Sequence, residues 1–161
     1  MPILHTQLAG QTKTPDGKLI QVPPAIALQQ RGPIVQVAVT LAEAMVAALA
    51  QQGKPTPPSV NGLALLDTGA SSTCIDDEEA QKMALPVIGV GSMSSASHAK
   101  TSSNIYPVQI EVTGFPIRFQ SPRTMGAALK EHGLLMLIGR DLLMHCVLIY
   151  NGATGQITLS I

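Results

Sequence analysis

One carboxylate in this sequence stands at the end of an apolar run and is followed at once by small and hydroxyl residues. Residues 63–66 are Leu-Ala-Leu-Leu, Asp67 comes next, and Thr68, Gly69 and Ala70 follow it. The apolar run predicts a buried strand. A carboxylate at the end of such a strand loses water, which is costly unless another group shares its charge. One chemistry uses this arrangement: two carboxylates about 3 Å apart share one proton and activate a water between them. The sequence therefore predicts that Asp67 is catalytic.

A second stretch, residues 135–143, combines an apolar strand with a glycine, an arginine and the start of a short helix. With Asp-Thr-Gly-Ala at 67–70 and Ile-Gly-Arg-Asp-Leu-Leu at 138–143, the chain resembles the retropepsin-like aspartic proteases, of the single-domain bacterial type. The likeness covers residues 33–161. It implies a mostly-β fold: a closed β-barrel of the acid-protease half-domain type, with one inserted helix and a short C-terminal helix.

The resemblance also implies roles around Asp67. Thr68 would bond across a two-fold axis, Gly69 would leave room for the substrate main chain, and Ala70 would keep the adjoining wall small. Support from the second stretch would come from Ile138, Gly139 and Arg140.

Arg140 departs from the family pattern. In that family a carboxylate just after the catalytic turn pairs with the arginine, whereas this chain has Ser71 and Ser72 there. The pair is either missing or replaced, through Asp141 or through a partner chain. Asp141 is interpreted as a helix cap more readily than as a catalytic group.

A count of aspartates predicts the quaternary structure. The chain has five, and only Asp67 lies in an Asp-Thr-Gly sequence. The chain thus holds half of a catalytic pair, and we expect a homodimer in which a second copy supplies the other half.

Proline and glycine residues mark the boundaries between the expected segments of the chain. Residues 1–32 are expected to form an N-terminal arm, with a turn at 15–18 and a strand at 19–22 that ends at two prolines. We expect that arm to pack on the domain or on a partner subunit, or else to be a partly ordered tail. Residues 33–39 alternate as a strand, and residues 41–58 form a helical insertion with a stiff connector.

Residues 87–112 are predicted to be a hairpin with a small, polar loop from 92 to 104. The resemblance implies that this hairpin is the flap that closes over bound peptide, while an ordinary surface loop is the simpler alternative. Its expected substrate-binding residues are Ser92, Met93, Ser94, Ser95 and His98.

The remaining segments follow local signals. Asp76 predicts the N-cap of an acidic helix, a reading preferred to a metal site. A strand is expected at 115–119, irregular structure at 121–133 with a helical turn at 127–130, and a final strand, turn and strand from 146 to 161.

The charge balance does not favour nucleic acid as a partner. Lys plus Arg and Asp plus Glu number ten each, so charge gives no reason to expect nucleic acid. No apolar run reaches the ~18 residues of a membrane span, and no secretory signal precedes the arm, so we expect a cytoplasmic protein. Cys74 and Cys146 are expected to be free thiols, and no histidine spacing indicates a metal. We expect no cofactor and no metal.

These observations predict an aspartic endopeptidase that hydrolyses peptide or protein substrates with a water activated by two Asp67 carboxylates. The alternative is a catalytically weak peptide-binding or assembly module of the same fold. A subunit of a larger assembly, docked through the arm and the inserted helix, is a further alternative.

Overall fold

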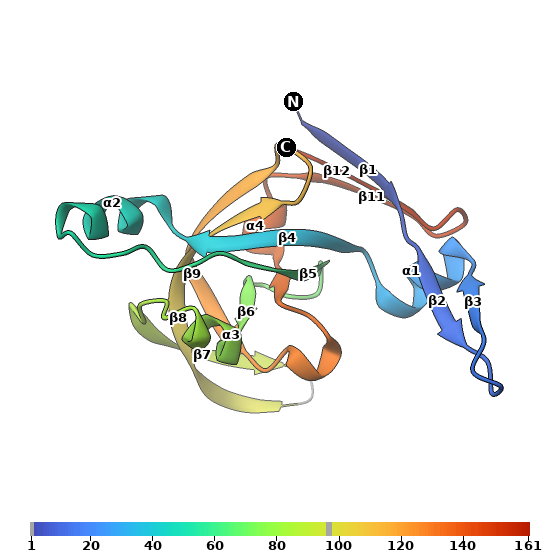
Figure 1. Cartoon of the computed structure of the whole chain (residues 1–161), viewed down its shortest axis with the longest axis horizontal. Helices are drawn as coiled ribbons and strands as arrows, with labels where there is room; N and C mark the ends of the chain where they lie inside the picture. Colours follow the sequence, from blue (N-terminus) through green and yellow to red (C-terminus); the bar gives the residue numbers. More distant parts are fainter. Residues whose placement is uncertain (1, 96–97) are drawn as a thin grey trace.

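The computed structural model describes residues 2–95 and 98–161 of the chain. Its regular structure is mainly strand, arranged as a barrel with a separate terminal sheet beside it (Figure 1). The two chain ends lie close together, because the first strand pairs with the last (Figure 1).

Six strands close the barrel. Their order is β4-β5-β10-β6-β9-β8, and a further pairing between β4 and β8 completes the circle, with β7 attached to the outer edge of β8. The barrel strands and β7 are β4 (Ile34–Leu41), β5 (Val60–Leu66), β6 (Cys74–Asp76), β7 (Gly89–Ser95), β8 (His98–Val112), β9 (Arg118–Ala127) and β10 (Met136–Ile138). The predicted architecture, a mostly-β closed barrel, is confirmed.

Strand β4 shows why these residues form the barrel. Val35, Val37, Val39 and Leu41 are buried while Gln36 is exposed, which is the alternation of a strand with one face in the core. The buried face joins one continuous core of aliphatic side chains.

Helices occupy the connections. The predicted insertion is α2 (Glu43–Gln51), and the short C-terminal helix is α4 (Arg140–Leu143). Helix α3 (Asp77–Lys82) begins where expected, because the side chain of Asp76 accepts a hydrogen bond from Glu79 N at 3.1 Å. The capping interpretation of Asp76 is therefore confirmed.

Much of the N-terminal segment packs on the rest of the chain. Strands β1 (Ile3–Gln7), β12 (Gln156–Ser160) and β11 (Val147–Asn151) form a three-stranded antiparallel sheet in the order β1-β12-β11, here called the terminal sheet. Leu4 and Leu28 are buried in the core. Strands β2 (Gly10–Lys13) and β3 (Leu19–Val22) form a separate hairpin that projects away from the barrel (Figure 1). The division of the chain at residues 32 and 33 stays a prediction.

The structure differs from the predictions in several segments. Helix α1 (Pro24–Arg31) was not foreseen, although Pro24 at its start has a backbone angle suited to a first helical turn. The strand expected at 115–119 instead runs from 118 to 127, through residues predicted to be irregular, and the helical turn lies at Lys130–His132. The hairpin strands β7 and β8 extend to Ser95 and from His98, so the polar loop is much shorter than 92–104.

Among the described residues, no helix has the length and apolarity needed to cross a membrane.

Candidate active site

The main chain around Asp67 is fixed by a strand that follows it far along the sequence. Strand β10 lies between β5 and β6, parallel to β5, with Ile138 opposite Leu66. The backbone N–H of Asp67 extends this pairing by donating to the carbonyl of Ile138 at 2.9 Å. The pairing of β5 with β10 therefore fixes the point at which Asp67 leaves β5.

The Asp67 carboxylate is held by the turn that it begins. Its Oδ1 atom accepts hydrogen bonds from Gly69 N at 2.8 Å and from Ala70 N at 3.2 Å. Asp67 is half-buried, while Thr68 and Gly69 are exposed. Among the hydrogen bonds of the described residues, none reaches Oδ2, so one carboxylate oxygen remains for a water, a substrate or a second carboxylate.

Gly139 lets the second stretch approach the Asp67 turn closely. A Cβ at this position would lie 2.6 Å from the carbonyl carbon of Ser72, so a larger residue would displace the main chain. Gly139 N donates to Thr73 Oγ1 at 3.1 Å, and the N–H of Arg140 donates to the carbonyl of Ala70 at 2.9 Å. Ile138, Gly139 and Arg140 thus contact the turn through their main chains.

The guanidinium of Arg140 binds the turn directly. Its Nη1 donates to the carbonyl of Thr68 at 2.8 Å and to that of Gly69 at 2.9 Å. The expected carboxylate partner is thus replaced by two carbonyl oxygens of the same loop. A charged donor shared by both carbonyls fixes the orientation of the Thr68–Gly69 peptide.

Asp141 binds the other end of the loop. Its Oδ2 accepts from Thr73 N at 3.0 Å and its Oδ1 from Thr73 Oγ1 at 2.8 Å, while Oδ1 also accepts from Leu142 N at 3.0 Å. Thr73 could not be identified from the sequence, because a threonine between two serines and a cysteine gives no local signal of a partner 68 positions away.

The thiol of Cys74 separates this loop from the predicted flap. Cys74 is buried, and its Sγ lies 3.5 Å from the carbonyl oxygen of Ser72 and 3.8 Å from the Sδ atom of Met93. Burial raises the pKa of Cys74 to about 11, with smaller contributions from the carboxylates of Asp141 and Asp67. The thiol is therefore neutral at ordinary pH and is not a nucleophile there. Burial also raises the pKa of Cys146, and both cysteines are free, as predicted.

Of the five expected flap residues, the structure brings Met93 toward the Asp67 loop, through Cys74. Ser92 is exposed on β7, opposite Ser102. Ser94, Ser95 and His98 are placed by their main chains in the two strands, and their side chains lie outside the described part of the structure, as does the tip at 96–97.

A pocket of about 760 Å³ lies against this hairpin. Both of its strands contribute, through Met93 and Thr101 among others, and the opposite wall comes from the start of α3 and from residues 126–131. Asp77 at this wall is held by Tyr106 Oη at 2.7 Å and by Gln81 Nε2 at 2.6 Å. The pocket therefore has a fixed polar wall and reaches, at Met93, the residue that contacts Cys74.

Within residues 2–95 and 98–161, no three or more His, Cys, Asp and Glu side chains gather as a metal-binding group. The structure does not test the expected catalytic and substrate-binding roles, which stay predictions.

Comparisons with known proteins gave matches among solved structures. No family model matches the chain, and no curated protein matches it by sequence. Among solved structures, the chain is similar to a retropepsin-like aspartic protease from Rickettsia conorii, at 12% identity and a TM-score of 0.44, over 98% of this chain and 92% of that one.

Proposed function

We propose that two copies of this chain form an aspartic endopeptidase, in which Asp67 and the Asp67 of the second copy activate a water for peptide hydrolysis. One carboxylate of the pair takes a proton from the water while the other donates its proton to the carbonyl oxygen of the substrate. The chemistry needs no covalent intermediate.

The observation that carries this proposal is the way the Asp67 turn is held. One carboxylate oxygen is fixed by two main-chain N–H groups, and the turn is bound by Arg140 on its carbonyl side. A general acid or base must be positioned before the reaction, and this arrangement positions Asp67 without using both of its oxygens. Thr68 and Gly69 are exposed, which leaves the turn open to a second copy.

The terminal sheet supports the homodimer. Ile3, Val147 and Ile149 lie on one face of the sheet by register, and each is more than half exposed, at 55%, 59% and 55%. Met144, which links α4 to β11, is 74% exposed. Met144 and β11 follow α4, whose Arg140 binds the Asp67 turn, and we propose that a second copy that completes the catalytic pair also covers these apolar side chains.

The pocket against the β7–β8 hairpin supports peptide as the substrate. Its volume is within the range of ligand sites, and its lining combines apolar residues such as Val90 and Met93 with polar and charged residues of β8 and of the opposite wall. We propose that it receives a side chain of the bound peptide, with the hairpin as the flap.

Asp67→Asn tests the mechanism. The amide cannot act as a base, so we expect hydrolysis of a peptide library to fall by at least about 10²–10⁴-fold, the range for loss of a general base. Asp16→Asn, in the exposed turn of the β2–β3 hairpin, is the matched control and should keep full activity. Full activity of a verified Asp67→Asn protein would overturn the mechanism.

Dilution tests the shared site. Activity per chain should decrease as the dimer dissociates, and sedimentation at the assay concentration measures that dissociation. A monomer that cleaves at the full rate would contradict the shared pair. A stable dimer that binds peptides without cleaving them at any pH would favour the alternative, a peptide-binding or assembly module.

A further inference from the structure

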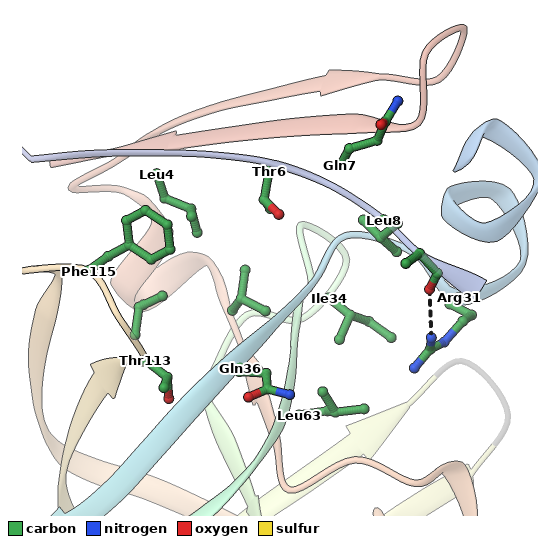
Figure 2. Close-up of a pocket in the computed structure, with 13 residues that line it drawn as sticks. Leu4, Thr6, Gln7, Leu8, Arg31, Ile34, Gln36, Leu63, Thr113 and Phe115 are labelled. Carbon is green, nitrogen blue, oxygen red and sulfur yellow. Dashed lines mark hydrogen bonds between the residues drawn. The ribbon is translucent and has the colours of Figure 1, made fainter. Parts of the chain in front are cut away.

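A second pocket, of about 390 Å³, lies between the terminal sheet and the barrel (Figure 2). We call it the edge pocket. No predicted site residue lines it. Leu4, Thr6 and Leu8 face it from the terminal sheet side, and Ile34 and Gln36 face it from β4 (Figure 2). Its volume is within the range of sites that hold small ligands or short peptide segments.

One wall of the edge pocket is an uncovered strand edge. Strand β8 accompanies β4 as far as Val37, and the last bond between them runs from Thr113 N to the carbonyl of Gln36 at 2.9 Å. Ile34 and Val35 pair with β5 on one side. Three consecutive residues, 34–36, line the pocket. Successive side chains of a strand point to opposite faces, so a pocket that touches all three meets the edge of the strand.

The opposite wall of the edge pocket is also an uncovered strand edge. Strand β1 pairs with β12 and is the outer strand of the terminal sheet, so its other edge is unpaired within the described chain. Residues 6–9, again consecutive, line the edge pocket. Two strand edges therefore border the same space, and an unpaired edge presents N–H and C=O groups that can pair with another extended chain.

Arg31 places a positive charge at one end of the edge pocket. Arg31, the last residue of α1, is exposed, and its Nη1 lies 3.5 Å from the carbonyl of Ala9, which is a long hydrogen bond (Figure 2). The side chains at the other end, Leu4 and Phe115, are apolar (Figure 2). A ligand that matches these walls has apolar side chains at one end and a carboxylate at the other.

We propose that the edge pocket binds an extended peptide segment that pairs with the uncovered edge of β4 at Ile34 and places an acidic residue against Arg31. Strand addition of this kind draws affinity from main-chain hydrogen bonds and selectivity from the side chains at either end. Asp67 does not line the edge pocket, and binding there does not depend on hydrolysis.

The test uses the full chain carrying Asp67→Asn, so that no probe is cleaved and a failure of the proposed hydrolysis leaves the result readable. The probe is a fluorescein-labelled hexapeptide of alternating valine and threonine that ends in glutamate, and binding is measured by anisotropy. We expect saturable binding, about threefold weaker when lysine replaces the glutamate, as for loss of an exposed ion pair. N-methylation of alternate peptide nitrogens should remove binding, because it removes the main-chain donors.

Matched variants locate the probe. Arg31→Glu should reverse the preference between the glutamate and lysine peptides, whereas Arg123→Glu, an exposed arginine on β9, should leave it unchanged. Gln36→Trp, at an exposed position, should fill the edge pocket and abolish binding. Circular dichroism of each variant checks that it is folded. No saturable binding, equal binding of the N-methylated peptide, or binding that survives both Arg31→Glu and Gln36→Trp would each overturn the proposal.

Discussion

Asp141 binds Thr73 at two points: one carboxylate oxygen accepts from the Thr73 main chain at 3.0 Å and the other from its hydroxyl at 2.8 Å. The same hydroxyl accepts from Gly139 N at 3.1 Å. Thr73 is fully buried, so these bonds are made away from water. The exit of the Asp67 loop is thereby fixed to the start of α4.

Thr73→Val should destabilise the chain by about 1–3 kcal/mol, because it keeps the shape but leaves the Asp141 carboxylate and Gly139 N each without one bond. Urea unfolding measures the change. Thr12→Val, at an exposed position of β2, is the control and should change the free energy of unfolding by less than about 0.5 kcal/mol. Equal stability of the two variants would show that the Thr73 hydroxyl contributes nothing.

Arg140→Lys should lower kcat of the proposed protease by about tenfold while the fold persists. The lysine keeps the charge, but its shorter side chain should not bring the ammonium to both carbonyls that Nη1 of Arg140 reaches, and the loss of one charged hydrogen bond costs about 1.5 kcal/mol. Measuring both peptide hydrolysis and a thermal melt of the variant separates a loss of kcat from a loss of stability. An unchanged kcat would mean that the turn holds its geometry without the guanidinium.

Cys74 gives the chain a pH-dependent stability. Its folded-state pKa of about 11 is raised above the ordinary 9.0. The neutral thiol is thus favoured in the folded state, and the stabilisation is complete below about pH 9 and lost as the pH rises through 11. The loss should be on the order of 2 kcal/mol.

The measurement for Cys74 compares the free energy of unfolding of the native chain and of Cys74→Ala at about pH 8 and about pH 11, below the window that the raised pKa defines and at its upper end. Other groups titrate equally in both proteins, so the difference between their pH slopes belongs to Cys74. Parallel slopes, or rapid alkylation of Cys74 by iodoacetamide at the lower pH, would contradict the raised pKa.

The proposed pair of carboxylates predicts a bell-shaped pH profile with its maximum at acidic to mildly acidic pH. The working state carries one proton over two carboxylates: at lower pH both are protonated and no base remains, and at higher pH both are ionised and no acid remains. Each limb of the pH profile reports the ionisation of the pair and not of one carboxylate alone. A rate that rises through neutrality to an alkaline plateau would indicate a different nucleophile, with the two cysteines the first to test.

Patterns with a strong local cause were predicted from the sequence. The alternation of β4, the helix over 43–51 and the Asp76 cap each depend on neighbours within a few positions, and all are confirmed. The same is true of the apolar run that ends at Asp67, in which Ala64 is fully buried opposite Met136 of β10.

Strand β9 could not be predicted because its cause is not local. Pro122 and the polar residues beside it argue against a strand. In the structure the pairing of β8 with β9 shifts register between Tyr106 and Val108, with Thr124 and Ser121 as their partners, so Pro107 and Pro122 both fall in the irregular step. A bulge accommodates residues that lack an N–H. The partner of Arg140 was unpredictable for a similar reason, because main-chain carbonyls carry no sequence signal.

The position of β10 between β5 and β6 has a consequence for synthesis of the chain. Arg140 comes 72 positions after Thr68, and at about 5–20 residues per second the ribosome adds it roughly 4–14 s later. Until then the nascent chain contains Asp67 without the strand and helix that fix its turn. The carboxylate therefore acquires its surroundings only after this later part of the chain has been made.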